Sequence, residues 1–167
     1  GKYTPFEKKS KDALYRIADP YTLFYYKFIK STKTTSNTYL SISQTASWPI
    51  WQGLAFENIC LYHIPQIKDK LGISGVNTLQ ASWIKKGNKL VQGAQIDMLI
   101  DRDDAIINVC EAKFSQDAFV IEKEYAKKLQ TKLSVFKQNI KSKKSVFLVF
   151  ISTTGVQKNE YYFDLVQ

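Results

Sequence analysis

The fold is decided by residues 95–113, which read Gln-Ile-Asp-Met-Leu-Ile-Asp-Arg-Asp-Asp-Ala-Ile-Ile-Asn-Val-Cys-Glu-Ala-Lys. Two apolar runs, Ile96–Ile100 and Ala105–Cys110, flank a polar turn at Asp101–Asp104. Short runs of β-branched residues separated by turn formers are typical of a β-hairpin. The apolar pattern is interrupted by three charged residues, Asp97, Glu111 and Lys113. A buried charge is costly unless it has a partner, and a metal ion is the usual partner of such carboxylates.

The alternation of side chains along a strand determines which charges share a face. Glu111 and Lys113 point to the same side of the sheet, together with Val109. A three-residue turn, Arg102–Asp104, would pair Asp97 with Val109 and set it diagonally beside Glu111, about 7–8 Å away between backbones. The opposite face would then be apolar with one exception, and it would carry Ile96, Met98, Ile100, Ile106, Asn108, Cys110 and Ala112. The register that gathers the charges therefore also predicts a coherent core face.

The composition indicates one folded domain. The chain has 167 residues, of which 44% are hydrophobic and 14% aromatic, and these values argue against disorder. A chain of this length buries enough surface to form a substantial core. No apolar run is long enough to cross a membrane, and no signal-peptide pattern opens the sequence. We therefore expect a cytoplasmic protein without membrane contact.

A few residue types indicate which metal site and which partner to expect. These are the charged residues, the cysteines and the histidine. Cys60 and Cys110 lie in apolar segments, where reduced and buried thiols are expected. With His63 as the single histidine and no Cys-x-x-Cys pair, we expect no zinc site. The net charge is +9, and all basic residues except Arg16 and Arg102 are lysines. Lysines suit non-specific contact with phosphates, so we expect a polyanion such as DNA as a partner, unless the lysines only keep the fold in solution.

Residues 1–47 are predicted to form an extension ahead of the main domain. Residues 1–9 form a short extended piece that looks like the cut edge of a longer protein. Asp19 and Pro20 are typical of a helix N-cap and first helical position. The helix that follows, Tyr21–Lys30, is rich in aromatic side chains and is expected to dock against an apolar surface. The polar stretch Ser31–Thr38 is predicted to be a linker or a helix cap.

Residues 48–167 are predicted to form the main domain. Its first helix, Trp48–Leu71, has little polar face, so we expect it to be largely buried and to be kinked at Pro65. The periodicity then predicts, in order, strands at Val76–Lys85, Lys89–Ile100 and Ala105–Phe114, an amphipathic helix at Ile121–Ile140, and strands at Ser145–Ser152 and Tyr161–Val166. The turn Lys86–Asn88 joins the first two strands. This order predicts an α/β fold with a mixed central sheet flanked by helices.

The motif Asp97, thirteen intervening residues and Glu111-Ala112-Lys113, after a helix that bears Glu57, resembles the PD-(D/E)XK nuclease superfamily. The resemblance spans residues 48–167, and the predicted αβββαβ order agrees with a restriction-endonuclease-like core. It implies a domain that cleaves DNA with Mg²⁺ or Mn²⁺. Asp97 and Glu111 would bind the ion with the Ala112 carbonyl, Lys113 would position the attacking water, and Glu57 would hold a second ion or orient the water.

Four stretches are also similar to the C-terminal DUF234-type domain of a family of prokaryotic P-loop ATPases: Asp12–Ile29, Gly53–Glu57, Ile96–Ile100 and Cys110–Phe114. The similarity implies that residues 1–9 are the end of a winged helix and that the rest of the ATPase chain is a partner. The present chain has no G-x-x-x-x-G-K-[ST] phosphate loop of its own. The sequence does not determine whether the chain forms an oligomer.

DNA contact is predicted for the basic face of the Ile121–Ile140 helix, at Lys123, Lys127, Lys128 and Lys132. An alternative is that Lys113 forms a buried ion pair with Glu111 or Asp97, in a domain that kept the fold and lost the chemistry. Such a domain would bind nucleic acid or dock as a regulatory module, with the aromatic helix Tyr21–Ile29 as its contact surface. For Glu57 the alternative is a surface residue that faces a gap in the packing.

Overall fold

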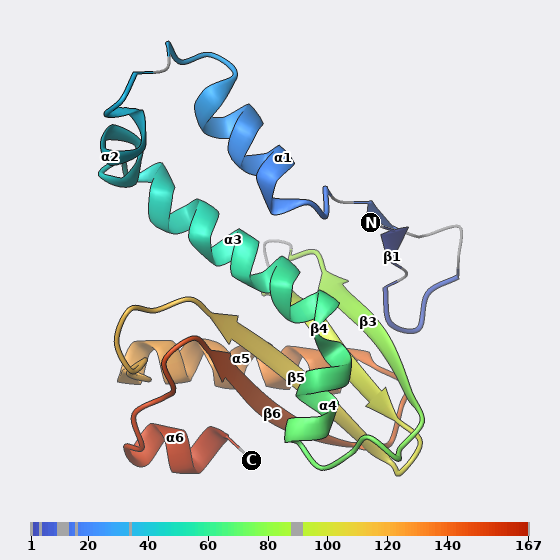
Figure 1. Cartoon of the computed structure of the whole chain (residues 1–167). Helices are drawn as coiled ribbons and strands as arrows, with labels where there is room; N and C mark the ends of the chain where they lie inside the picture. The colour runs from blue at the N-terminus through green and yellow to red at the C-terminus, as the bar shows by residue number, and fades with distance from the viewer. Residues whose placement is uncertain are drawn as a thin grey trace.

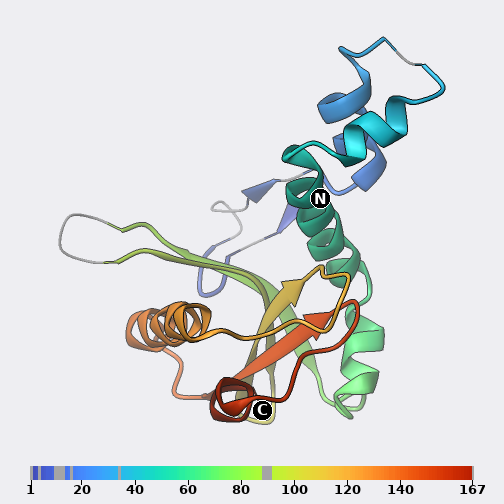
Figure 2. The same cartoon turned by 90° about the vertical axis from the view of Figure 1, so that its left-hand side faces the viewer.

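The computed structural model describes residues 2–3, 5–9, 14–15, 17–33, 35–87 and 92–166. They form an α/β fold with a four-stranded mixed sheet, as the sequence predicts (Figure 1). Helix α5 (Lys123–Asn139) covers one face of the sheet, and α3 (Ser47–Tyr62) with α4 (Ile64–Lys70) lies on the other (Figure 2). In the described part of the chain, no helix is long and apolar enough to cross a membrane.

The sheet has the spatial order β3-β4-β5-β6. Its strands are β3 (Thr78–Lys85), β4 (Ala94–Arg102), β5 (Ile106–Lys113) and β6 (Ser145–Ser152). The first three strands pair antiparallel, and β6 lies parallel to β5. A parallel pair needs a long crossover, which α5 provides. The αβββαβ order expected from the sequence is therefore confirmed, and β6 has the bounds that the sequence predicted.

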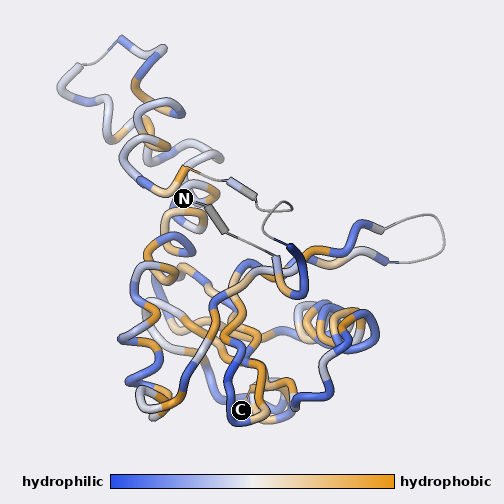
Figure 3. Tube along the Cα trace, turned by 90° about the vertical axis from the view of Figure 1, so that its right-hand side faces the viewer, coloured by the Kyte–Doolittle hydropathy of each residue, from blue (hydrophilic) through white to orange (hydrophobic). Residues whose placement is uncertain are grey.

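Each face of the sheet carries its own core, because helices cover both faces. Hydrophobic residues accordingly follow the strands in Figure 3. The core under α5 contains Trp83, Ile96, Leu99, Ile107, Val109, Leu129, Phe136 and Leu148. The core under α3 and α4 contains Cys60, Ile64, Ile73, Met98, Ile100, Cys110 and Val149. Both cysteines are free and buried, as predicted.

The β4–β5 register differs by two residues from the predicted one. Leu99 pairs with Val109, so the three-residue turn is Asp103–Ala105 and not Arg102–Asp104. Arg102 stays in the strand, where its guanidinium binds the Asp104 carboxylate. Ala105 takes the left-handed conformation, with φ 66°. This conformation is uncommon for a residue other than glycine, and propensity alone does not predict it.

A β-bulge in β4 also changes the predicted core face. Ala81 pairs with Leu99 and Trp83 with Ile96, so two residues of β4, Asp97 and Met98, lie opposite Ser82 alone. The extra residue puts Ile96 on the same face as Leu99, under α5. The prediction that Ile96 belongs to the other face was wrong, whereas Met98, Ile100, Cys110 and Ala112 lie there as expected.

The last predicted strand, Tyr161–Val166, is instead a helix, α6 (Glu160–Leu165). Asn159 caps it by accepting a hydrogen bond from the Tyr162 N–H, and its amide donates to the Ile121 carbonyl. The aromatic residues of this segment favour a strand, but the cap determines its structure. The first three predicted strands also start later than predicted: β3 begins at Thr78 and not at Val76, β4 at Ala94 and not at Lys89, and β5 at Ile106 and not at Ala105. Residues 88–91, which belong to the second predicted strand, lie outside the described residues.

Residues 20–54 form an arm that projects from the sheet (Figure 1). It contains α1 (Pro20–Phe24), the π-helix η2 (Tyr25–Ile29), α2 (Thr38–Ser43) and the first half of α3. Asp19 caps α1 as predicted, and the rings of Phe24 and Phe28 dock on Trp48 and Trp51. Helix α2 follows the predicted linker Ser31–Thr38. No helix or strand was predicted for residues 39–47.

The long helix breaks near Pro65, as expected: α3 ends at Tyr62, and Pro65 lies in the first turn of α4. The prediction that this helix is largely buried was wrong. Ile50 and Leu54 in the first half of α3 are 67% and 50% exposed, and Ile59 and Tyr62 in its second half are 44% and 57% exposed.

Ahead of the arm, β1 (Lys2–Tyr3) pairs antiparallel with β2 (Leu14–Tyr15). Between them, the Phe6 N–H donates to the Ser82 carbonyl, and the Phe6 ring packs 6.0 Å from the Phe136 ring. The Glu7 carboxylate accepts hydrogen bonds from the backbone of residues 141 and 142, just after α5. These contacts attach residues 5–7 to the edge of the sheet.

Candidate functional site

Glu111 lies at the centre of a polar cluster between β5 and α5. Its side chain is 12% exposed. Its Oε1 accepts a hydrogen bond of 2.6 Å from the Tyr125 hydroxyl and lies 3.1 Å from the Lys113 Nζ. Its Oε2 accepts a hydrogen bond of 2.7 Å from the Lys132 Nζ. Both oxygens of this half-buried carboxylate are therefore held by positively charged or hydroxyl donors.

Local geometry explains why α5 supplies two of these donors. Tyr125 and Lys132 are seven residues apart, which is two helical turns, so they lie on one face of α5. That face also carries Leu129 and Phe136, which pack against the sheet. The Lys113 Nζ lies 5.3 Å from the centre of the Tyr125 ring, so it contacts the ring as well as the carboxylate.

The electrostatics of the cluster favour an ionised Glu111. Burial by itself raises the pKa of Glu111. The charge and hydrogen bond of Lys132, the hydrogen bond of Tyr125 and the charge of Lys113 together outweigh burial, and the pKa lies below its usual range. Burial, followed by the charge and hydrogen bond of Glu111, raises the pKa of Tyr125. Tyr125 therefore remains a neutral donor to an ionised carboxylate at neutral pH.

Asp97 lies on β4, in the bulge opposite Ser82. The pairing of β4 with β5 begins at Met98 and Cys110, so Asp97 lies one residue beyond the paired region, on the strand next to the one that carries Glu111. The predicted pairing of Asp97 with Val109 was wrong, because Val109 pairs with Leu99. Asp97 is half-buried, and its Oδ1 accepts a hydrogen bond of 2.7 Å from the Gln95 side chain.

Glu57 approaches the same end of the sheet from α3. Its neighbour Phe56 contacts the ring of Phe114, directly after β5, at 6.2 Å between centroids. The Glu57 charge is the last of the causes that raise the pKa of Tyr125, after burial and Glu111, so its field extends to the cluster. It also adds to burial in raising the pKa of Cys60 to about 11. Glu57 is half-buried and lies on the side of α3 that faces the sheet core, close to Cys60.

The four lysines predicted to contact DNA do not share one environment. Lys123, Lys127 and Lys128 are exposed on the outer face of α5. Lys132 is turned inward and pairs with Glu111. Lys132 therefore belongs to the candidate site, whereas the other three form an exposed basic surface.

The donor atoms of the cluster suit a small hard cation. Among the described residues, no three side chains of His, Cys, Asp or Glu gather closely enough to hold a metal ion. Mg²⁺ needs fewer protein ligands, since it keeps several waters and is commonly bound through one or two carboxylates. Asp97, Glu111 and the Ala112 carbonyl supply such oxygens, and binding through Glu111 requires Lys132 or Lys113 to release one carboxylate oxygen. The residues present therefore fit Mg²⁺, provided that Lys132 or Lys113 moves away from one Glu111 oxygen.

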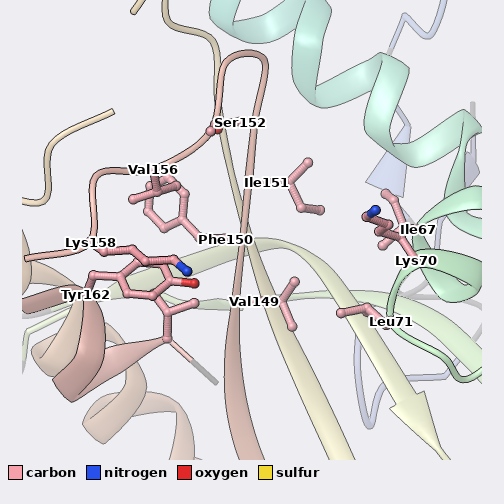
Figure 4. A pocket seen from close by; sticks show the side chains of 12 residues that line it. Ile67, Lys70, Leu71, Val149, Phe150, Ile151, Ser152, Val156, Lys158 and Tyr162 are labelled. Atoms are coloured by element: carbon pink, nitrogen blue, oxygen red, sulfur yellow. The ribbon is translucent and has the colours of Figure 1, made fainter. Parts of the chain in front are cut away.

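A separate hollow lies at the edge of the sheet. It has a volume of about 420 Å³ and runs beside β6 (Figure 4). One wall comes from α4, with Ile67, Lys70 and Leu71, and the other includes Val156, Lys158 and Tyr162. No carboxylate and no predicted site residue lines it, so it is distinct from the Glu111 cluster.

Sequence reasoning did not identify two residues of the site. Tyr125 lies within the predicted amphipathic helix Ile121–Ile140 but was not predicted as a site residue, and neither was Gln95. The sequence contains a signal for Tyr125, because a tyrosine on the core-facing side of a helix needs a hydrogen-bond partner for its hydroxyl. Comparisons of this chain with family models, with curated proteins and with solved structures found no match. The interpretation of the site therefore depends on its own geometry.

Proposed function

We propose that this chain is a metal-dependent phosphodiesterase domain of the restriction-endonuclease-like type that cleaves DNA at the Glu111 cluster. The observation that supports this proposal is the Lys113 ammonium 3.1 Å from the Glu111 carboxylate on β5, next to the strand that carries Asp97. Two acids and a lysine thereby lie on neighbouring strands, beside a helix with exposed lysines. This combination suits a phosphate ester substrate.

Each residue has a role that follows from its chemistry. Asp97, Glu111 and the Ala112 carbonyl would hold Mg²⁺ or Mn²⁺, which stabilises charge on the phosphate and lowers the pKa of a bound water. Lys113 would orient the attacking water and offset the negative charge that develops on the phosphate. Glu57 would orient the same water. The exposed lysines Lys123, Lys127 and Lys128 would bind the phosphates of the strand.

The first test is calorimetric titration of Mn²⁺ into the wild type and into Asp97→Ala. The proposal predicts that the wild type binds Mn²⁺ and that Asp97→Ala binds it at least about tenfold more weakly. Supercoiled and single-stranded DNA would then be incubated with Mg²⁺ or Mn²⁺. Cleavage by the wild type should be lost in Asp97→Ala and Lys113→Ala while their circular dichroism is unchanged. Equal cleavage by these variants would refute the proposal.

A second candidate function is supported by the contacts of Glu111 itself. Both of its oxygens are occupied by Lys113, Lys132 and Tyr125, which is the arrangement of a structural ion-pair network. In that case the chain is a non-catalytic module that binds nucleic acid or regulates an attached ATPase. It predicts no Mn²⁺ binding and salt-dependent DNA binding that Asp97→Ala retains in full. Absence of DNA binding by the wild type would count against a nucleic-acid role for this module.

A further inference from the structure

The first half of α3 has an apolar side that nothing in the described chain covers. Its inner side packs through Trp48 and Trp51 against α1 and η2. Its outer side carries Ile50 and Leu54, which are 67% and 50% exposed. A helix with apolar residues on all sides is normally packed against other elements on all sides. On this arm, the side of α3 that carries Ile50 and Leu54 lacks such a packing partner among the described residues.

A groove runs along this bare side, between α1–η2 and α3. Leu23 and Lys27 form one wall, and the other wall consists of Ser47, Ile50, Trp51 and Leu54. Its volume is about 210 Å³. The α3 residues are spaced three, four and seven apart, so they line one helix face. Such a pair of helices with apolar walls has the form of a groove that accepts a third helix.

Trp51 supplies a polar atom that lacks a partner. Its indole nitrogen is buried and has no hydrogen-bond acceptor among the described residues. A buried donor without an acceptor is unfavourable, so the packing around Trp51 is incomplete in the described chain.

The charges around the groove indicate the kind of partner that it fits. Residues 20–54 contain no Asp or Glu, and their charged side chains are Lys27, Lys30 and Lys33. Lys27 lines the groove itself. An apolar groove with a lysine at its wall and no acidic residue in the surrounding arm is complementary to leucine-like side chains flanked by carboxylates.

We propose that this groove binds an acidic amphipathic helix of a protein partner. Apolar side chains of that helix would pack between Leu23, Ile50 and Leu54, and its carboxylates would meet Lys27. Trp51 is the one aromatic side chain among the described lining residues, and it is half-buried, so the groove offers little stacking surface to nucleic-acid bases, which bind on exposed aromatic faces. A second copy of this chain offers α6, which carries Glu160, Asp164 and the exposed Phe163, but α6 has only six residues. That is less than two turns, too short to fill a groove that follows two turns of α3.

The test uses the full chain labelled with ¹⁵N and two synthetic helical peptides of about five turns. One peptide has leucines on one face and glutamates on the other, and the second has lysines in place of the glutamates. The indole N–H signal of Trp51 is identified by its loss in Trp51→Phe. The glutamate peptide should shift this signal, because Trp51 lines the groove, and should bind at least about tenfold more tightly than the lysine peptide.

Three variants locate the contact. Ile50→Asp should weaken binding of the glutamate peptide by at least about tenfold, and Lys27→Glu should reverse the preference between the two peptides. Leu79→Asp, at an equally exposed leucine on β3, should leave binding unchanged. Asp97→Ala should also bind normally, because the groove is separate from the Glu111 cluster and does not depend on the proposed nuclease activity.

Four results would overturn the proposal. The first is no shift of the Trp51 signal with the glutamate peptide, and the second is equal binding by Ile50→Asp. The third is a larger affinity of the groove for a single-stranded oligonucleotide, which would make it a nucleic-acid surface. The fourth is a concentration-dependent shift without peptide that Phe163→Asp abolishes, which would assign the groove to α6 of a second copy.

Discussion

Glu111 accepts contacts from two lysines and one tyrosine, so its protonation state controls the whole cluster. The sequence predicted that Glu111 and Lys113 share a face, since alternation along one strand requires it. It did not predict the inward turn of Lys132, because a lysine on an amphipathic helix is usually solvated. It also set the β4–β5 register two residues away from the observed one, because the left-handed Ala105 in the turn is a local exception to regular geometry.

Acid should weaken the fold through Glu111. The pKa of Glu111 is lower in the folded protein than its ordinary value, so the unfolded chain takes up a proton first as the pH falls. The stabilisation is complete above about pH 5, where both states are ionised, and is lost as the pH falls through the folded pKa. Urea unfolding at pH 7, 5 and 3 should show that the stability difference between wild type and Glu111→Gln shrinks with acid.

Glu124→Gln is the matched control for this measurement, because Glu124 is also a glutamate and lies next to Tyr125 on α5, but it is exposed. Its stability difference from the wild type should stay nearly constant over the same pH range. A difference between wild type and Glu111→Gln that is independent of pH would contradict the ion-pair network.

Lys132 should compete with a metal ion for Glu111. Its Nζ occupies the Oε2 atom at 2.7 Å, so Lys132→Ala frees an oxygen for Mn²⁺. We expect Mn²⁺ to bind about tenfold more tightly to Lys132→Ala than to the wild type, as measured by calorimetry. Lys128→Ala, on the exposed face of α5, serves as the control and should bind Mn²⁺ like the wild type. Weaker binding by Lys132→Ala would show that Lys132 supports the metal site and does not compete for it.

At the scale of elements, the periodicity of hydrophobic residues was the most reliable indicator of helices and strands. The regular patterns of α5 and β6 predicted both elements closely, and Pro65 predicted the break between α3 and α4. Segment 161–166 was misassigned because its aromatic residues favour a strand. The helix is set by the Asn159 cap on Tyr162, and Asn159 is held in place by the Ile121 carbonyl, which is far away in sequence. Tertiary contacts such as the one with Ile121 cannot be read from a local pattern.

The exposed lysines of α5 allow a prediction about how DNA binding depends on salt concentration. Lys123, Lys127 and Lys128 are exposed, so each can neutralise one phosphate and release one counterion. Replacing all three by glutamine should weaken DNA binding and reduce the slope of log K against log salt by about 2.7 for double-stranded DNA. Fluorescence anisotropy at several salt concentrations measures both quantities. An unchanged slope would place the DNA contact elsewhere on the molecule.

At the scale of the whole molecule, a layered α/β body carries a helical arm of different character. The body has two cores, one on each face of the sheet, whereas the arm is held together mainly by aromatic contacts among Phe24, Phe28, Trp48 and Trp51. The sequence predicted the layers, because strands alternating with amphipathic helices have few other arrangements. It could not predict the projection of the arm, since an apolar pattern does not tell which partner covers it.

Hydrogen exchange should distinguish the helical arm from the sheet. The helices α1, η2 and α2 have only five or six residues each, and helices this short depend on packing for their stability. We expect their amides to exchange at least about 100-fold faster than those of β4 and β5, because the arm opens without unfolding the sheet. Mass spectrometry of peptic fragments measures these rates. Equal protection of the arm and the sheet would show that they unfold as one cooperative unit.

The absence of acidic residues from the arm has a consequence for proton linkage. Residues 20–54 contain no Asp, Glu or His, the side chains that ordinarily titrate between about pH 3 and pH 8. The groove therefore has no side chain of its own that gains or loses a proton on binding in this range. Any protons taken up when a partner docks there must be bound by that partner's carboxylates or by parts of the chain outside the arm. The pH dependence of docking would thus report the chemistry of the partner before the partner is identified.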